Sequence, residues 1–459
     1  MNVRRVWIVT TAALVLFAIA VRFVINFSHT YPPGVNAAYY PLQAGSWLLH
    51  GRLMYDDLPL IFWVDAGLAR AIAAFGMPIH DALLFATRIV DSVFEPFAAV
   101  AIMAFGYVWS AGRLRALGGC VAAAMLVVLS PPILRMLSDF EKNSLGLVFM
   151  CAALWACRSA MATSRVGSWI SLSVVLVLTA LTHLGAFAMT LLLVGVSSVV
   201  WGVVLVPRRY TTQVVVTVGA ASATLLAVVA TVDVHRFERL VRAPVALFRS
   251  GPIESLELPV IVVITLLVAM ALWTAWRDRR ALLAADVAIV SALAVVTAIL
   301  IAPKSYVYFN RLLLMLPVSG SLLLAFVIAR SSRADLWAGT ALLVLASAAA
   351  VSAPASVQRP LMNPDVASEL LLLQQRISDA DRTLVVAPHG FEWWAGHLLG
   401  TRVRGELPAG AKREYQQVLL LRNTADCPPD VVSPFRAPDV ADGARPLFAG
   451  RYIEVYEAP

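Results

Sequence analysis

Two adjacent carboxylates, Asp56 and Asp57, stand in the stretch MYDDLPLIFW, residues 54–63, of a chain that carries little charge elsewhere. A positioned carboxylate can remove a proton from a hydroxyl group as a general base. Two neighbouring carboxylates repel each other, which raises the pKa of one of them where the site is partly desolvated. The alternative is a solvated turn in which an aspartate caps the following helix. The elements around the pair must decide between these readings.

The composition places most of this chain in a membrane. Hydrophobic residues make up 60% of the sequence and charged residues 14%, whereas soluble globular proteins carry about 25% charged residues. The net charge of +8 comes from short basic clusters between apolar stretches. That pattern is typical of cytoplasmic loops and unlike a nucleic-acid-binding surface. The four cysteines show neither a metal-binding spacing nor a disulfide framework.

Eleven mostly apolar stretches approach the length of about 20 residues that a helix needs to cross a bilayer. They are residues 6–26, 90–109, 115–133, 144–160, 167–183, 184–206, 212–232, 258–276, 282–302, 311–329 and 336–354. Arginines stand at every second junction, beginning with Arg4 and Arg5 before the first stretch. This alternation predicts a multi-pass inner-membrane protein with a cytoplasmic N-terminus. The first stretch could be a cleaved signal peptide, but its length favours an uncleaved anchor.

The junctions that face outward hold most of the unusual polar residues. They are 27–89, 134–143, the corner at His183, 233–257, 303–310 and the tail from about residue 355. In the first of them, AAYYPLQAGSWLLHG and LPLIFWVDAGLARAIAAFG have the apolar spacing of helices. We predict two helices lying on the outer membrane surface with the carboxylate pair between them. An active site is therefore expected on the extracytoplasmic side.

The composition changes after residue 354, where a small α/β part is expected. TLVVAP and YQQVLLLRN have the pattern of strands, GFEWWAGHLLG that of a helix, and RPLFAGRYIEVYEAP that of a closing strand pair. The predicted organisation is a polytopic α-helical membrane domain, residues 1–354, followed by a periplasmic α/β domain, residues 355–459. No glycine-rich phosphate loop is found in the sequence.

The first outer loop, NAAYYPLQAGSWLLHGRLMYDDLPLIFW, resembles that of the membrane glycosyltransferases of the C superfamily. This group includes protein O-mannosyltransferases and the aminoarabinose transferase of lipid A. Tyr39, Gly51, Asp57 and Pro59 fit the loop pattern of the family. PPILRMLSDFEKNSLGL, LTHLGAF and YFNRLLLMLP resemble later segments, so the resemblance covers roughly residues 6–330. The tail resembles the small periplasmic domain that many such enzymes carry.

One feature departs from the family: its usual Asp-Glu pair falls at Asn36 and Ala37, and asparagine cannot act as a general base. The resemblance implies transfer of a sugar from a polyprenyl-phosphate donor to a lipid, glycan or protein acceptor, without a nucleotide cofactor. Such transfer needs a carboxylate base, and cations or a divalent metal ion at the leaving phosphate. We predict Asp57 as the base, Asp56 as its orienting partner or a metal ligand, and Asp139 as a second acid.

Residues with cationic, acidic or aromatic side chains on the outward side are the candidates for binding the substrate. Arginine offers a bidentate fork to phosphate and lysine a point charge. The predicted substrate-binding residues are Tyr39, Arg135, Glu141, Lys142, His183, Lys304, Tyr306 and Arg311. Asp57 and His183 are also candidate metal ligands. The alternative roles are a helix-capping charge cluster, a structural histidine, and an aromatic belt with snorkelling cations.

The tail offers a second aromatic group, His389, Glu392, Trp393 and Trp394, which could stack against a sugar. Adjacent tryptophans point to different sides of a helix, so at least one of them is expected to pack in the core, and packing is favoured for the group.

Two other functions compete with sugar transfer. A transporter of lipid-linked sugars would carry charges at mid-span and repeated halves, which this sequence does not show. A non-catalytic homologue that binds a polyprenyl lipid or a partner protein would explain Asn36.

Overall fold

The structure is a computed structural model that describes residues 2–134, 136–205, 219, 222, 257–301, 316–333, 359–429, 431–433, 435–441 and 444–458. The chain divides into two compact units. Unit one comprises residues 1–21, 93–136 and 142–356, and unit two comprises residues 22–92, 137–141 and 357–459.

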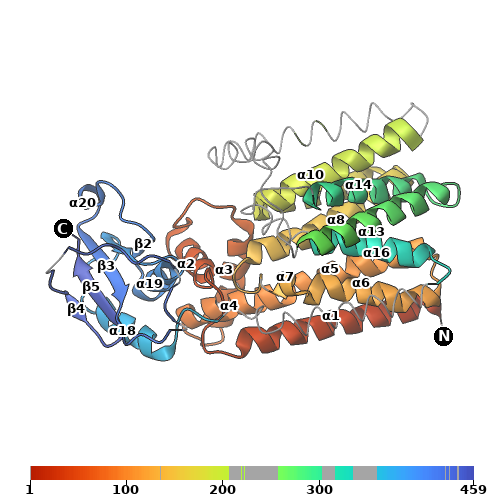
Figure 1. The fold of residues 1–459 in the computed structure, drawn as a ribbon. Helices are drawn as coiled ribbons and strands as arrows, with labels where there is room; N and C mark the ends of the chain where they lie inside the picture. The colour runs from red at the N-terminus through yellow and green to blue at the C-terminus, as the bar shows by residue number, and fades with distance from the viewer. Residues whose placement is uncertain are drawn as a thin grey trace. The chain divides into compact units, whose positions relative to one another are not determined.

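Unit one is helical throughout its described residues. After the start of α1 (Val3–Phe27), its helices are α5 (Ala98–Trp109), α6 (Leu117–Leu129), α7 (Pro131–Leu134), α8 (Glu141–Thr163), α9 (Val166–Thr182), α10 (Leu184–Val199), α13 (Glu257–Arg277), α14 (Ala284–Ile301) and α16 (Leu316–Arg330). Short 3₁₀ helices, η1 (Glu95–Phe97) and η2 (Leu114–Ala116), precede α5 and α6, and a π-helical turn, η3 (Val200–Leu205), continues α10. Helices α13, α14 and α16 run side by side (Figure 1).

One buried acid of unit one, Asp286, is paired with a cation. Asp286, buried in α14, accepts hydrogen bonds from the guanidinium of Arg158 at 2.6 and 3.1 Å. Its Oδ1 also accepts one from the indole of Trp109 at 3.0 Å. Isolated charges are costly inside an apolar helix bundle, and these contacts satisfy the carboxylate within the unit.

Five described helices are long and apolar enough to cross a membrane. They are Val3–Phe27, Ile79–Trp109, Glu141–Thr163, Leu184–Gly202 and Ala284–Ile301. Helices lie within nine of the eleven predicted stretches. Of the other two, 336–354 lies outside the described residues, and so does 212–232 apart from residues 219 and 222. The second predicted stretch begins at residue 90, whereas the helical segment begins at Ile79. The prediction missed the first turns because their polar residues lower the local hydropathy.

Unit two combines helices from the first outer loop with a small α/β part. The loop forms α2 (Tyr39–His50), α3 (Leu60–Ala73) and α4 (Ile79–Val93). The two predicted loop helices are therefore confirmed as helices. Helix α2 ends at Gly51, which has the left-handed φ of 67° that glycine adopts without strain.

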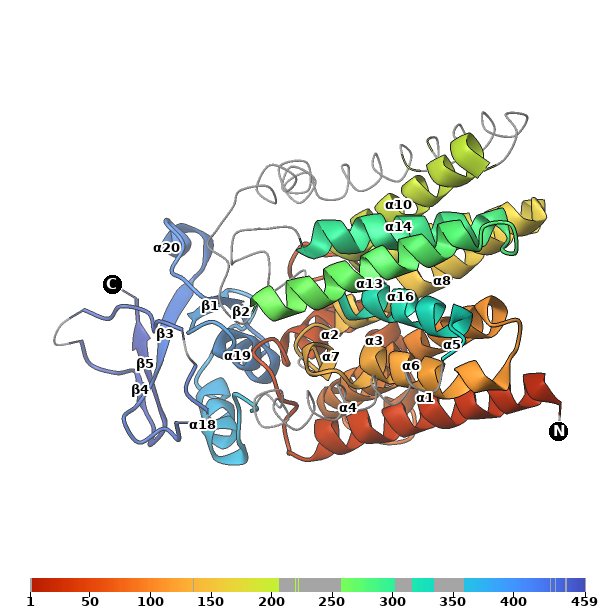
Figure 2. The same cartoon turned by 45° about the vertical axis from the view of Figure 1, so that its right-hand side comes forward.

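The sheet of unit two has five strands in the order β2-β1-β3-β5-β4. The strands are β1 (Thr383–Val386), β2 (Arg402–Arg404), β3 (Gln417–Asn423), β4 (Phe448–Ala449) and β5 (Ile453–Glu457). Strand β1 pairs in parallel with β2 and β3, and β5 pairs antiparallel with β3 and β4. The helices are α18 (Pro364–Gln374), α19 (Phe391–Leu399) and α20 (Ala411–Glu414), and α19 lies beside β1 and β2 (Figure 2). The predicted strands and helix of the tail are confirmed; β2 was not predicted.

One hydrophobic core joins the first loop to the tail. Ala37, Ala38 and Leu42 are buried in the same cluster as Phe391 and Trp394. A parallel bridge between Gly34 and Pro360 ties the two segments together as well. The predicted domain boundary at residue 354 falls outside the described residues and stays a prediction.

Candidate active site

The first turn of α2 brings Asp57 and Tyr39 together. The hydroxyl of Tyr39 donates a hydrogen bond of 2.5 Å to Oδ2 of Asp57. The amide of Gln43, one turn further along α2, donates to the Tyr39 oxygen at 3.1 Å and to the carbonyl of Tyr55 at 2.9 Å. The backbone N–H of Leu58 donates to Oδ1 of Asp57 at 2.7 Å. The Asp57 carboxylate is thus held in one orientation at a half-buried position.

A second carboxylate, Asp139, lies against Asn36, three residues before the start of α2. Its Oδ1 accepts the backbone N–H of Asn36 at 2.7 Å and the side-chain amide of Asn36 at 2.9 Å. Asp139 is buried. The two residues are 103 positions apart in the sequence, so the loop before α8 is joined to the start of α2 through this pair. Asparagine therefore serves here as a hydrogen-bond donor to an acid supplied by another segment.

Ser138 sets the position of Asp139. Its backbone N–H donates to the carboxylate of Asp91 at 2.7 Å, and its hydroxyl donates to Asn26 Oδ1 at 2.5 Å. The side chain of Arg22 contacts Asp91 at 3.5 Å. Ser138 has a φ of 59°, in the left-handed region that non-glycine residues rarely adopt. Such a conformation costs of order 1–3 kcal/mol and persists only where surrounding contacts enforce it, as these do.

Aromatic residues of the tail complete one wall beside Tyr39. The ring of Trp393 in α19 lies edge-on to Tyr39 at 4.9 Å and to Tyr55 at 5.5 Å. Tyr55 donates its hydroxyl hydrogen to the Val403 carbonyl at 2.6 Å. Burial raises the pKa of Tyr55 to about 12, so this phenol stays neutral and links the loop to β2. Trp394 is fully buried in the core. The sequence analysis favoured packing for this group, which holds for Trp394, whereas Trp393 lines the site.

His389 and Glu392 form a hydrogen-bonded pair of 2.7 Å beside Trp393. The hydrogen bond to Glu392 raises the pKa of His389 above its usual range. Partial burial lowers this pKa, whereas the negative charges of Glu392 and Asp139 raise it further. The His389 side chain is 41% exposed while that of Glu392 is 2% exposed. His389 and Glu392 thus form a polar pair beside Trp393, a feature that sequence reasoning had set aside.

Two buried acids of unit two, Asp65 and Glu141, carry oxygen atoms that accept no hydrogen bond from a described residue. Both oxygens of Asp65 and one oxygen of Glu141 are buried with no hydrogen-bond partner among the described residues. Burial raises the pKa of Asp65 well above its usual range, and the charge of Asp91 adds to this effect. A neutral, protonated Asp65 is the form that such surroundings stabilise.

The remaining predicted residues are distributed between the two units. Asp56 is exposed, next to Asp57. His183 belongs to unit one, where its Nδ1 caps α10 by accepting the N–H of Ala186 at 3.1 Å, and the half-buried Lys142 belongs to the same unit. The predicted residues Arg135, Lys304, Tyr306 and Arg311 lie outside the described residues.

The predicted divalent metal has no assembled ligand set in the described part of the chain. There, no group of three or more His, Cys, Asp or Glu side chains is placed to hold a metal ion. Of the three candidate ligands, Asp56 and Asp57 belong to unit two and His183 belongs to unit one. The reaction proposed below therefore uses only side chains of this protein.

Comparisons with known proteins identify the fold. No protein-family model and no curated sequence matches the chain. ArnT from Cupriavidus metallidurans matches in the apo state over 99% of this chain and 98% of that chain, with a TM-score of 0.59 and 14% identity. The same enzyme bound to undecaprenyl phosphate matches over 98% of both chains, with a TM-score of 0.56 and 14% identity.

A second enzyme has a similar structure. The oligosaccharyltransferase of Archaeoglobus fulgidus, in the apo form, matches 86% of this chain with a TM-score of 0.57 and 11% identity. This chain spans 64% of the length of the archaeal enzyme. Both neighbours are membrane glycosyltransferases of the C superfamily, so the resemblance seen in the sequence is confirmed for the fold: the chain folds as a C-superfamily membrane glycosyltransferase does.

Proposed function

We propose that this protein transfers a sugar from a polyprenyl-phosphate donor to an acceptor hydroxyl on the extracytoplasmic side of the membrane. The observation that carries the proposal is a pair of oriented carboxylates at the start of α2: Asp57 accepts a hydrogen bond from Tyr39, and Asp139 accepts one from Asn36. The fold supports it, since one neighbour of the same fold was solved with undecaprenyl phosphate bound.

In the proposed reaction Asp57 accepts the proton of the acceptor hydroxyl. The acceptor oxygen then forms a bond with the anomeric carbon of the sugar, and the bond from that carbon to the phosphate oxygen breaks. The electron pair of that bond leaves with the polyprenyl phosphate. Tyr39 orients the base through its 2.5 Å hydrogen bond. A base that is already held in place needs little reorganisation during the transfer, which is how positioned groups accelerate reactions.

Asp139 serves a different purpose in this scheme. Positive charge develops on the anomeric carbon as the phosphate departs, and a fixed carboxylate stabilises such charge. Asp139 Oδ1 accepts hydrogen bonds from the backbone N–H and the side-chain amide of Asn36, which fix the direction of the carboxylate. Trp393 and Tyr55 offer apolar ring surface for the sugar on the side of the tail. The cations predicted for the phosphate, Arg135, Lys304 and Arg311 among them, remain proposals.

Turnover of defined donors by the purified full chain tests the proposal. A panel of polyprenyl-phosphate sugars is offered in detergent, and release of free polyprenyl phosphate is measured with divalent metal present and with metal chelated. Asp57→Asn is expected to lower turnover by roughly 10²–10⁴-fold, the range for loss of a general base. Asp439→Asn, which removes an exposed ion pair with Arg436, is the matched control and is expected to retain turnover.

Donor binding without turnover, equal in the parent chain and in Asp57→Asn, would overturn the transferase assignment. That outcome would favour the alternative of a non-catalytic homologue, which the asparagine at position 36 suggests because it replaces the acid usual in the family. Turnover that survives both Asp57→Asn and Asp139→Asn would support the transferase assignment and would reject the roles assigned to the two carboxylates.

A further inference from the structure

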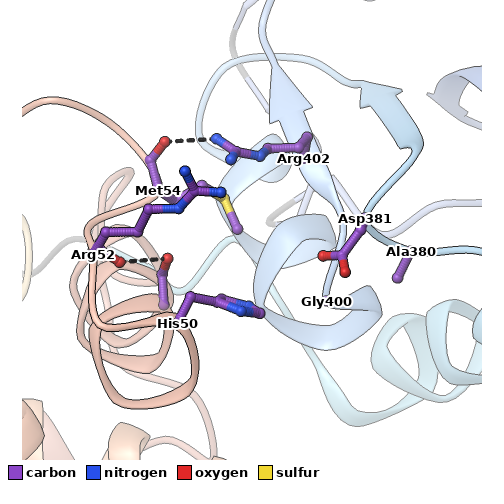
Figure 3. A pocket seen from close by; sticks show the side chains of 8 residues that line it. His50, Arg52, Met54, Ala380, Asp381, Gly400 and Arg402 are labelled. Atoms are coloured by element: carbon purple, nitrogen blue, oxygen red, sulfur yellow. Dashed lines mark hydrogen bonds between the residues drawn. The ribbon is translucent and has the colours of Figure 1, made fainter. Parts of the chain in front are cut away.

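A charged cavity of about 240 Å³ lies within unit two, and neither Asp57 nor Asp139 is among its lining residues. Figure 3 shows its lining, which comes from the end of α2, the loop after it, the loop before β1, and the start of β2. The lining residues are Ser46, His50, Arg52, Met54, Ala380, Asp381, Gly400 and Arg402. Binding pockets for whole small molecules have volumes of about 300–1,000 Å³. The volume is therefore that of a headgroup rather than of a complete substrate.

Two guanidinium groups and one carboxylate line this cavity with most of their hydrogen-bonding capacity unused. Arg402 donates from Nη1 to the carbonyl of Met54 at 2.8 Å, which fixes its position and leaves its other N–H groups without a partner among the described residues. The side chains of Arg52 and Asp381 make no hydrogen bond or ion pair with any described residue, and both residues are exposed. Figure 3 shows Arg52 beside Arg402, with Asp381 on the opposite wall.

An apolar groove continues from the same cavity. The two hollows share four residues, Ser46, His50, Met54 and Gly400. The groove is further lined mainly by apolar side chains, which include Leu42, Leu48, Leu49, Ile79 and Leu83. Ile79 is the first residue of α4 and of the segment Ile79–Trp109, which is long and apolar enough to cross a membrane. The groove thus reaches the start of this apolar segment.

We propose that the cavity and groove bind a phospholipid whose headgroup carries both a phosphate and an amine, such as phosphatidylethanolamine. Arg52 and Arg402 hold the phosphate, because a guanidinium matches two phosphate oxygens at once. Asp381 accepts the ammonium, and the first carbons of an acyl chain cover the groove. A plain anion would leave Asp381 facing a like charge, so the arrangement of charges selects a zwitterion. This site is separate from the residues of the proposed transfer.

Direct binding measurements on the full chain in detergent test the proposal without any turnover. Native mass spectrometry and thermophoresis would follow titration with three probes: dihexanoyl phosphatidylethanolamine, dihexanoyl phosphatidylglycerol and inorganic phosphate. We expect saturable binding of phosphatidylethanolamine, at least tenfold tighter than that of the other two. Arg52→Gln is expected to weaken it at least tenfold, because the guanidinium has no other described partner and its loss leaves the fold intact.

Arg382→Gln is the matched control, because Arg382 is exposed in a neighbouring turn and its guanidinium forms only a loose ion pair of 3.8 Å, with Asp379, among the described residues. It is expected to bind as the parent does. Asp381→Asn should weaken phosphatidylethanolamine binding, because the ammonium loses its acceptor, and should strengthen phosphatidylglycerol binding, because a like charge is removed. Equal affinity for inorganic phosphate would overturn the lipid assignment, and equal affinity for phosphatidylglycerol would overturn the amine contact. The site itself is rejected if Arg52→Gln and Arg382→Gln bind alike. Because the experiment measures only binding, its result does not depend on whether the protein has transferase activity.

Discussion

Asn36 and Asp139 determine where negative charge lies beside the α2 N-terminus. The family pattern has an acid at the position of Asn36, and in this chain the acid is Asp139, whose Oδ1 accepts the Asn36 amide at 2.9 Å. An aspartate at position 36 would bring a second carboxylate to hydrogen-bonding distance of a buried one. Like charges at this distance repel strongly and force one group to take up a proton. The asparagine therefore pairs with Asp139 without adding a second negative charge.

Exchanging the two side chains tests this relation. Asn36→Asp alone is expected to lower both the melting temperature and turnover, although it restores the residue usual in the family. The double variant Asn36→Asp with Asp139→Asn keeps one amide and one carboxylate in the pair, so the melting temperature should recover while turnover stays low. Thermal unfolding and donor turnover on the three proteins give the result. Full activity in Asn36→Asp would show that Asp139 has no role as an acid.

Helix α19 is the element that connects the aromatic wall to the first loop. Gly396 lies where a Cβ atom would stand 3.0 Å from Leu42 and 3.1 Å from Val403. These distances are tighter than most side-chain contacts, so α19 approaches α2 and β2 as closely as a glycine permits. The spacing of Trp393 from Tyr39 depends on this approach.

Gly396→Ala should therefore destabilise the protein by about 1–3 kcal/mol, the usual cost of overpacking a core. Gly67→Ala is the matched control, since a Cβ atom there meets nothing within 4 Å on the exposed face of α3. The control should be neutral or slightly stabilising, because alanine favours a helix over glycine by roughly 1 kcal/mol. Chemical denaturation of both variants gives the comparison. Equal stability would mean that α19 is not tightly packed against α2.

His397, on the same helix, predicts a pH dependence of stability. It is buried, its Nε2 has no described partner, and burial lowers its pKa to about 3, with the charge of the nearby His80 acting in the same direction. The unfolded chain therefore binds a proton below pH ~6.5 that the folded chain refuses until about pH 3. Stability should fall as pH decreases through this window, by up to ~1.4 kcal/mol per pH unit.

His397→Leu is expected to flatten that slope, since it removes the only group to which the effect is assigned. Unfolding free energies of parent and variant between pH 7 and pH 4 measure it. His389, whose pKa is shifted upward, is the contrasting site, and His389→Gln should leave the acid slope in place. An unchanged slope in His397→Leu would assign the effect to another group.

At the scale of the whole molecule, unit two is built from three separate parts of the chain. The core cluster of the tail includes Ala37, Ala38 and Leu42 from the first loop. Residues 355–459 expressed alone should therefore fail to form a cooperatively folded domain, because removing these side chains exposes Phe391 and Trp394 to water.

Circular dichroism melting and NMR amide dispersion of that fragment test the expectation. Co-expression with residues 1–354 provides the control, and should restore the fold by supplying the missing core residues. A fragment that unfolds cooperatively by itself would show that the tail is an independent domain, as its composition predicts.

The sequence by itself determined the classes of element. Apolar length predicted the membrane helices, short apolar runs predicted β1, β3 and the closing pair of β4 and β5, and the apolar spacing of the first loop predicted α2 and α3. These signals are local, because each depends on residues within one turn or one strand. The resemblance of the first loop to a known family extended them to the fold.

Only the tertiary structure decided which residues meet. Asp139 reaches Asn36 across 103 residues, and Trp393 rather than Trp394 faces Tyr39. Neither fact has a local signal, since each depends on how α19 and the loop before α8 pack against the start of α2. The same holds for the cavity between Arg52 and Arg402, whose charges meet through the folding of distant segments. The sequence determines which functional groups are available, whereas packing of the helices and strands determines which of these groups lie close together.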